Sequence, residues 1–174
     1  MINPKYHFYL DMDGVIADFD GRFKEYTGYY PKEYQEKFSK KEFFKEINKG
    51  GHKFWAEMQW TPFGQKIWNK LKGLNVSILT SPGEFHQAKE GKLEWVNKHL
   101  GDVKVDFKLS GQKHTILDDR SIPKDSETEE RMYHVLIDDH YSNLIPWDEA
   151  GGKSIKVTHN NTSAVIKDIS STQK

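Results

Sequence analysis

YLDMDGVIADF, residues 9–19, is the stretch from which the fold can be worked out. Asp11 and Asp13 directly follow a short apolar run, residues 7–10, which we predict to be a buried strand. Residues two apart in an extended chain share a face, so the two carboxylates point the same way. Gly14 then permits a sharp turn that opens the strand end to a ligand. Such a pair lets one carboxylate attack phosphorus or bind a metal while the other handles a proton.

The rest of the chain alternates short apolar runs with stretches of helical pattern, which predicts βαβ units and an α/β fold with a parallel sheet. Further strands are expected at residues 76–80, 103–109, 135–137 and 154–157. A helix is predicted to begin at the pair Thr61 and Pro62 and to end before Gly73. Because ligands bind outside the carboxyl ends of parallel strands, the polar ends of the first, second and fourth strands should converge on one site.

The ends of the second and fourth predicted strands carry side chains that could bind a phosphate or a metal ion. The second ends in Thr80 and Ser81, whose hydroxyls, followed by a helix start, form a phosphate cradle; either could instead merely start a turn. The fourth ends in Asp138 and Asp139, and adjacent carboxylates that lose water suggest a cation beside them. With oxygen ligands and no cysteine, Mg²⁺ is the expected ion.

A rival pair, Asp118 and Asp119, could also be read as a strand end. It runs into Pro123 and a charged stretch, so we predict a surface loop there and place the metal at the later pair.

Composition narrows the function classes. The chain has 174 residues, 36% hydrophobic and 30% charged, with no apolar run near the roughly 18 residues that a membrane span needs. Lys plus Arg equals Asp plus Glu at 26 each, so a long nucleic acid is not the favoured partner. Cysteine is absent and the N-terminus has no secretory pattern, from which we expect a cytoplasmic protein. One domain over residues 1–174 is expected, with the oligomeric state left open.

Residues 16–60 do not fit the alternation and are rich in aromatic residues, so we predict a small helical insertion there, with a capping box at Ser39 and Glu42. Its mixed charges indicate a solvated helix face rather than a binding patch.

Asp11, Asp13, Thr80, Lys92 and the pair Asp138–Asp139 come in the order of the four motifs of the haloacid dehalogenase superfamily. Within it, residues 11–19, 80–82 and 92–96 resemble the 5'(3')-deoxyribonucleotidase family, a likeness that covers roughly two thirds of the chain. The resemblance implies a Rossmann-like parallel sheet flanked by helices, with the insertion as a cap after the first strand. The family tends to have an arginine after the paired aspartates, where this chain has His140.

The resemblance also implies roles. Asp11 would be the nucleophile and Asp13 the proton donor and later the base. Magnesium would be held by the Asp11 carboxylate, the Asp13 carbonyl and Asp138. Thr80 and Ser81 would bind phosphate oxygens, Lys92 would neutralise their charge, and Asp139 would orient Lys92 or a metal-bound water. Phe19 matches a base-contacting position; for Phe54 and Trp55 a place in the core is the more common one.

The implied activity is a magnesium-dependent phosphatase acting on a (deoxy)nucleoside monophosphate. Alternatives are another phosphoester, such as a 3'-phosphorylated nucleic acid end or a sugar phosphate, a receiver-like domain, and a catalytically dead binding module. Motif order disfavours the receiver, which has its acidic pair first and a lone acceptor aspartate before its threonine and lysine, whereas here a second aspartate pair comes last. The full set of chemical groups disfavours the inactive module.

Overall fold

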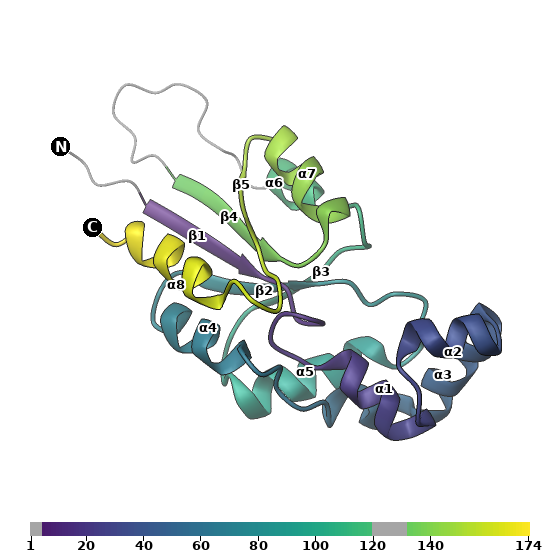
Figure 1. Ribbon diagram of the computed structural model, residues 1–174. Coiled ribbons are helices and arrows are strands. Elements are labelled where there is room, and N and C mark those ends of the chain that lie inside the picture. The colour runs from purple at the N-terminus through teal and green to yellow at the C-terminus, as the bar shows by residue number, and fades with distance from the viewer. Residues whose placement is uncertain (1–4, 120–131) are drawn as a thin grey trace.

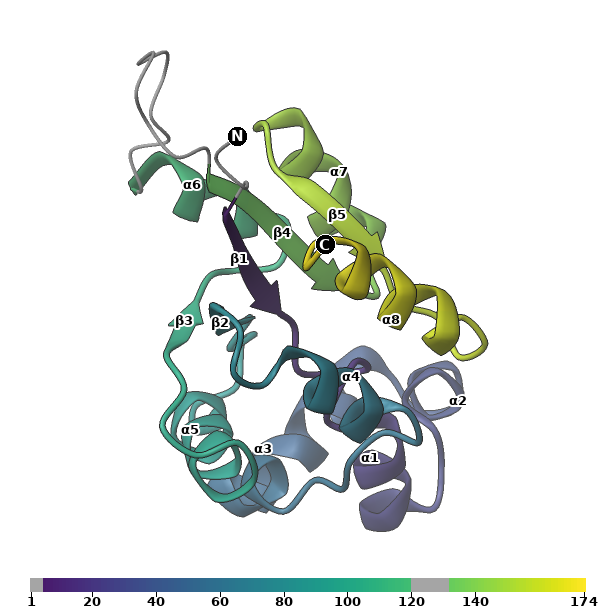
Figure 2. The same ribbon diagram turned by 90° about the vertical axis from the view of Figure 1, so that its left-hand side faces the viewer.

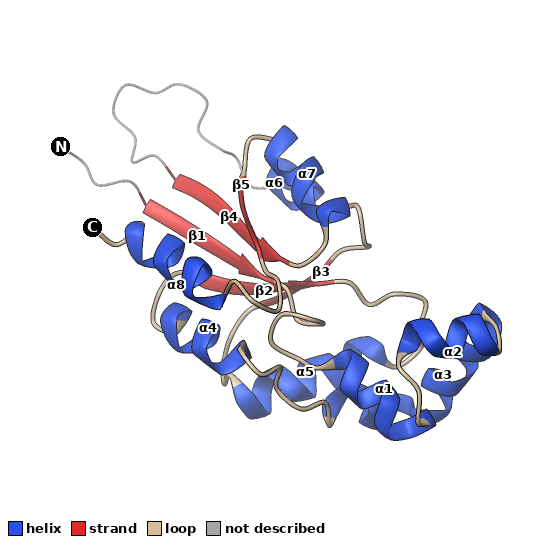
Figure 3. Ribbon diagram, in the orientation of Figure 1, coloured by secondary structure: helices blue, strands red, loops and turns tan. Residues whose placement is uncertain are grey.

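The computed structural model describes residues 5–119 and 132–174, and its centre is a five-stranded parallel sheet in the order β3-β2-β1-β4-β5. The strands are β1 (Lys5–Leu10), β2 (Val76–Thr80), β3 (Val105–Phe107), β4 (Met132–Asp138) and β5 (Lys153–Lys156). Figures 1 and 3 show this sheet with helices around it. The predicted parallel α/β architecture is confirmed, although β3 is shorter than expected.

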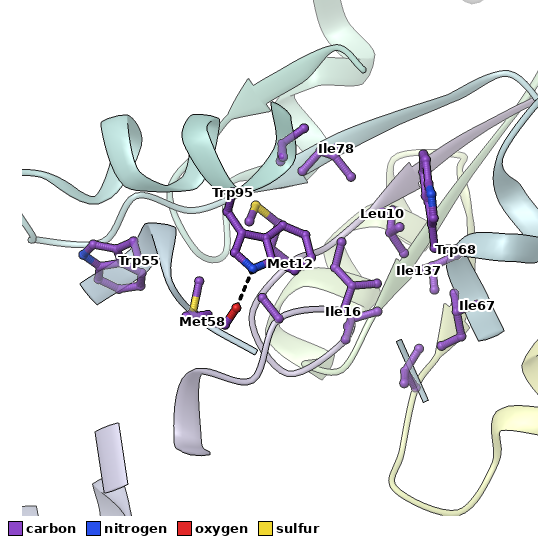
Figure 4. Packing of buried hydrophobic residues seen from close by; sticks show 14 of the residues in the cluster. Leu10, Met12, Ile16, Trp55, Met58, Ile67, Trp68, Ile78, Trp95 and Ile137 are labelled. Atoms are coloured by element: carbon purple, nitrogen blue, oxygen red, sulfur yellow. Dashed lines mark hydrogen bonds between the residues drawn. The ribbon is translucent and has the colours of Figure 1, made fainter. Parts of the chain in front are cut away.

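Alternate residues of β1, β2 and β4 belong to two separate hydrophobic clusters. Phe8 and Leu10 of β1 belong to the larger cluster, with α4 (Gly64–Leu71), α5 (Ala88–His99) and α8 (Thr162–Ser171). Tyr9 belongs to the smaller cluster, with α6 (Ile116–Asp119) and α7 (Tyr141–Glu149). The period of two along the strand therefore places helices on both faces of the sheet. Figure 4 shows the packing in the larger cluster around Leu10, Ile78 and Ile137.

The predicted insertion is helical. It contains α1 (Phe19–Thr27), α2 (Pro31–Lys37) and α3 (Lys40–Ala56), which lie together beyond the carboxyl ends of the strands (Figures 1 and 2). Ser39 accepts a hydrogen bond from the backbone N–H of Glu42 and so caps α3, which is one of the two hydrogen bonds of the predicted capping box.

The two segments that connect the insertion to the core run side by side. The N–H of Asp18 donates to the carbonyl of Gln59, and the N–H of Thr61 donates to that of Ile16, so the segments form a narrow antiparallel ribbon. Its residues Ile16 and Ala17 are fully buried. The insertion is therefore joined to the core by paired rather than independent linkers.

The predicted start of α4, with Thr61 as the N-cap and Pro62 in the first turn, is wrong by two residues, since the helix begins at Gly64 after the N-cap Phe63. The Thr61 hydroxyl donates to the carbonyl of Val15 at 2.8 Å instead of capping the helix. Thr61 is thus committed to the connecting ribbon, and the helix can begin only after it. The predicted end holds: α4 stops at Leu71, and Gly73 follows at a φ of +87°.

The rival acidic pair lies in α6, a short helix, and Asp118 is exposed there. The loop expected after it, residues 120–131, lies outside the described residues. Within the described ranges, no helix is long and apolar enough to cross a membrane.

Candidate active site

Three neighbouring strands carry the predicted residues to one edge of the sheet. Asp11 directly follows β1, Thr80 ends β2 and Asp138 ends β4, and β1 lies between the other two strands. Leu10 is in register with both Ile78 and Ile137, so the strands finish at the same level. All three polar residues are buried, which places their chemistry in a low-dielectric environment.

Asp11, Asp138 and Asp139 form an acidic cluster, with one carboxylate oxygen of each within 4.8 Å of the others. Burial raises the pKa of Asp11 to about 6, against the opposing charge of Lys113. Burial also raises the pKa of Asp139 to about 8, and the charges of Asp11 and Asp138 add to the shift. The three carboxylates together are therefore short of positive charge.

Lys113 is the site residue that the sequence analysis missed. Its ammonium lies 2.8 Å from Asp11 Oδ1 and 2.7 Å from Asp138 Oδ2, and its side chain is 1% exposed. Burial lowers the pKa of Lys113, but the charges of Asp11 and Asp138 outweigh this and raise it above the usual value. The signal was its place a few residues after the third predicted strand, whose carboxyl end must lie at the same edge of a parallel sheet.

Asp138 is fixed by two groups at the start of α7. Its Oδ1 accepts from the N–H of His140 at 2.8 Å, and its Oδ2 accepts from Asn143 Nδ2 at 3.1 Å. Asn143 Oδ1 in turn accepts from the N–H of Gly111 at 2.8 Å. This buried amide therefore ties the segment that carries Lys113 to the end of β4.

Lys92 and Asp13 form the second ion pair of the site, with Lys92 Nζ 2.9 Å from Asp13 Oδ2. Lys92 also donates to Thr80 Oγ1 at 3.0 Å and to the carbonyl of Ser81 at 2.6 Å. The expected neighbourhood of Lys92, Thr80 and the first motif is present. The ion pair that Lys92 makes is with Asp13, whereas Asp139 had been one of its expected partners.

Ser81 and Phe19 lie at the margin of this centre. The Ser81 hydroxyl accepts from the N–H of Gly83 at 3.3 Å. Phe19 is half-buried and stacks on Trp55, with ring centroids 5.5 Å apart and planes at 28°. Phe54 is fully buried and Trp55 is 3% exposed, as the core interpretation of these two residues requires. The aromatic rings of the insertion thus pack on one another next to Lys92.

The acidic cluster fits a magnesium ion. Asp139 Oδ1 is buried and has no hydrogen-bond partner among the described residues, and its carboxyl faces two others. Oxygen donors of this density suit a hard dication, which would offset the mutual repulsion of these carboxylates. Asp11, Asp138 and Asp139 would supply the carboxylates. The Asp13 carboxylate is turned to Lys92, which leaves its backbone carbonyl as the group that the resemblance assigned to the metal.

No model of a protein family matches the chain, and a comparison with curated protein sequences finds no match. Solved structures do resemble it. A hydrolase from Streptococcus pneumoniae TIGR4 has a TM-score of 0.56 at 14% identity, covering 94% of this chain and 99% of that one. A haloacid dehalogenase-like hydrolase from Burkholderia xenovorans LB400 has a TM-score of 0.52 at 14% identity, covering 88% and 81%. The L-2-haloacid dehalogenase from Xanthobacter autotrophicus has a TM-score of 0.53 at 10% identity, covering 97% and 83%.

At these sequence identities the similarity shows the fold alone, and the chemistry has to be inferred from the residues of the site. The five-stranded parallel sheet and the similarity to these solved structures lead to the same conclusion. The chain has the haloacid dehalogenase-like α/β fold.

Proposed function

We propose that this chain is a magnesium-dependent phosphomonoesterase that acts through a covalent phosphate on Asp11. The observation that supports this most directly is that two carboxyls two residues apart, one buried and one partly buried, have different surroundings. Asp11 lies with Lys113 and the acidic cluster, while Asp13 is paired with Lys92. The two carboxyls therefore face different groups, and Asp13 Oδ1, which has no hydrogen-bond partner among the described residues, is the oxygen left to carry a proton.

The reaction can be written with these groups. An Asp11 oxygen attacks phosphorus, the bond from phosphorus to the ester oxygen breaks, and Asp13 gives its proton to that oxygen. Asp13 then takes a proton from water, whose oxygen attacks phosphorus and releases phosphate from Asp11. Magnesium, when bound, would supply positive charge for the phosphoryl oxygens. Uncatalysed phosphate ester hydrolysis is so slow that the site must lower the barrier by on the order of 20 kcal/mol or more.

Several groups suit the phosphoryl oxygens. The Thr80 hydroxyl lies at the end of β2, and the Lys113 ammonium lies beside the Asp11 oxygen that would attack. Charge-assisted contacts of this kind are the strong ones in a buried site. We assign phosphate binding to Thr80, Ser81 and Lys113.

For the substrate, we propose a (deoxy)nucleoside monophosphate. The support is the resemblance at the first motif together with the aromatic group of the insertion, in which half-buried Phe19 packs on Trp55, whose ring in turn contacts Lys92. In this proposal residues 16–60 are a cap over the site within a single domain of residues 1–174. A sugar phosphate or a 3'-phosphorylated end is the alternative within the same chemistry.

Because one of the similar structures is a dehalogenase, halide displacement has to be weighed too. A halide leaves without a proton, whereas an ester oxygen benefits from a donor. Asp13, whose Oδ1 is left to carry such a proton, therefore favours an ester. Phosphate release should be measured from mononucleotides, a 3'-phosphorylated oligonucleotide and sugar phosphates, and chloride release from a 2-chloro acid, with and without Mg²⁺. Magnesium-dependent phosphate release, greatest from mononucleotides, is expected. Chloride release alone would refute the proposal.

A further inference from the structure

The Lys92 ammonium has no N–H left for a substrate. The side chain is 1% exposed, and its nitrogen donates to Asp13 Oδ2, Thr80 Oγ1 and the carbonyl of Ser81. An ammonium group has three N–H donors, and these three acceptors use them all. A phosphoryl oxygen could be bound only by breaking one of these buried hydrogen bonds.

The Lys92 ammonium also contacts an aromatic ring of the insertion. Lys92 Nζ lies 5.0 Å from the centre of the Trp55 ring, within the range of a cation–π contact. Trp55 is itself held between Phe19 and Phe85, with ring centroids 5.5 Å and 5.1 Å away. The position of Lys92 is therefore fixed from the sheet and from the insertion at once.

The backbone around Lys92 leaves it little freedom. The preceding residue, Gly91, lies so close to α3 that an added Cβ would be 2.3 Å from the carbonyl oxygen of His52. Trp95, one turn later, donates its indole N–H to the carbonyl of Met58 at 2.8 Å (Figure 4). The helix that carries Lys92 is thus held against the insertion on both sides of this residue.

We infer that Lys92 is a positioning residue, which holds the Asp13 carboxyl in the orientation for proton transfer and is itself held by Trp55. This rests on the proposed function and deepens it. Charge on the phosphoryl group is then the task of Lys113, which contacts Asp11, and Lys92 acts on the leaving oxygen through Asp13. The inference departs from the role that the family resemblance gave to Lys92.

A leaving-group comparison separates the two roles. An alkyl phosphate releases a poor leaving group that needs a proton from Asp13 as the bond from phosphorus to oxygen breaks, whereas p-nitrophenolate leaves readily as an anion. The ratio kcat/KM reports only the steps up to departure of the leaving group. Losing the orientation of Asp13 should therefore lower kcat/KM for the alkyl ester and spare it for the aryl ester.

The test uses Lys92→Met, with Lys98→Met as the control, since Lys98 is exposed on the same helix. We expect kcat/KM to fall by about 10²-fold or more on an alkyl phosphate and by less than about threefold on p-nitrophenyl phosphate. Hydrolysis of the Asp11 phosphate also needs Asp13, so the variant should show a burst of p-nitrophenolate followed by slow turnover. Equal losses of kcat/KM on both esters would overturn the inference and return Lys92 to phosphate binding.

A second variant guards against misfolding of the first. Trp55→Phe keeps a ring but weakens the contact with the ammonium, and it should reduce kcat/KM in the same leaving-group pattern by about threefold or more. Equal effects on both esters would again count against the inference. A wild-type protein that hydrolyses neither ester would refute the proposed function itself, whereas an active wild type with no leaving-group difference refutes only the role of Lys92.

Discussion

Gly14 approaches the Asp139 carboxylate so closely that a Cβ on this residue would lie 2.4 Å from Asp139 Oδ2. The backbone here also has a φ of +80°, which side chains rarely adopt. The turn that follows Asp13 and the position of the Asp139 side chain thus depend on each other through Gly14.

Gly14→Ala should destabilise the fold by about 1 to 3 kcal/mol from backbone strain alone, and it should weaken Mg²⁺ binding because Asp139 has to move. Gly73→Ala is the matched control, since Gly73 has a φ of +87° and open space around its Cβ. It should show the strain and leave metal binding unchanged. Urea unfolding and a magnesium titration measure the two effects. Equal magnesium affinity in both variants would contradict the coupling.

Asp11→Asn should fold and lose turnover, because an amide can neither attack phosphorus nor balance a metal charge. The phosphorylated enzyme that the wild type forms with substrate should be absent from the variant after an acid quench, as seen by mass spectrometry. Retention of about a tenth of the wild-type rate would exclude covalent catalysis through Asp11.

Lys113→Met removes the cation that Asp11 and Asp138 share. Without metal at about pH 8, the free energy of unfolding should fall by about 3 to 5 kcal/mol, the usual cost of breaking a buried ion pair. The pKa of Asp11 is already raised by burial, so the uncompensated carboxylates are destabilising above their pKa values and the loss should shrink toward about pH 5.

Magnesium should recover part of that stability in Lys113→Met and stabilise it more than it stabilises the wild type, which thermal unfolding with and without the ion would reveal. A variant as stable as the wild type at both pH values would show that Lys113 does not balance the acidic cluster.

Asp138→Asn should weaken magnesium binding strongly, and Asp118→Asn should hardly change it. Asp138 lies in the acidic cluster, whereas Asp118 is exposed in a short helix. Calorimetric titration of both variants compares them directly. Loss of magnesium binding in Asp118→Asn would move the metal site to the rival pair.

Phe19→Ala should reduce activity on nucleotides about tenfold or more relative to a small phosphate ester without a base, since a stacking contact is worth roughly 1 to 3 kcal/mol. Phe38→Ala, at a residue of the same insertion that is 49% exposed, serves as the control. If both substrates suffer equally from Phe19→Ala, the ring only packs against Trp55.

The parallel sheet could be predicted because its buried strands appear in the sequence as short apolar runs that end in polar residues. Asp11, Thr80 and Asp138 followed from that pattern alone. Lys113 could not be found in the same way, since a lysine in a short 3-10 turn has no periodic neighbours to mark it. The segment that carries Lys113 is positioned by Asn143, thirty positions later in the chain, whose side-chain oxygen accepts a hydrogen bond from the N–H of Gly111.

The partner of Lys92 was equally hidden. Sequence order places Lys92 near the site, but the choice between a phosphate, Asp139 and Asp13 depends on how closely α3 approaches α5 at Gly91. Such tertiary packing leaves no local trace in the sequence. The same holds for Thr61, whose hydroxyl donates a hydrogen bond to the carbonyl of Val15 and does not cap the helix that follows.

The paired connection of Asp18 with Gln59 and of Ile16 with Thr61 gives the insertion the attachment of a loop on a hairpin stem. The stem fixes where the chain leaves and re-enters the core, whatever lies between. Exchange of residues 19–56 for another helical segment would then alter which molecules are admitted while Asp11 and the sheet stay in place. Gly91 sets the condition for such an exchange, because the new segment has to offer a backbone that can lie directly against it.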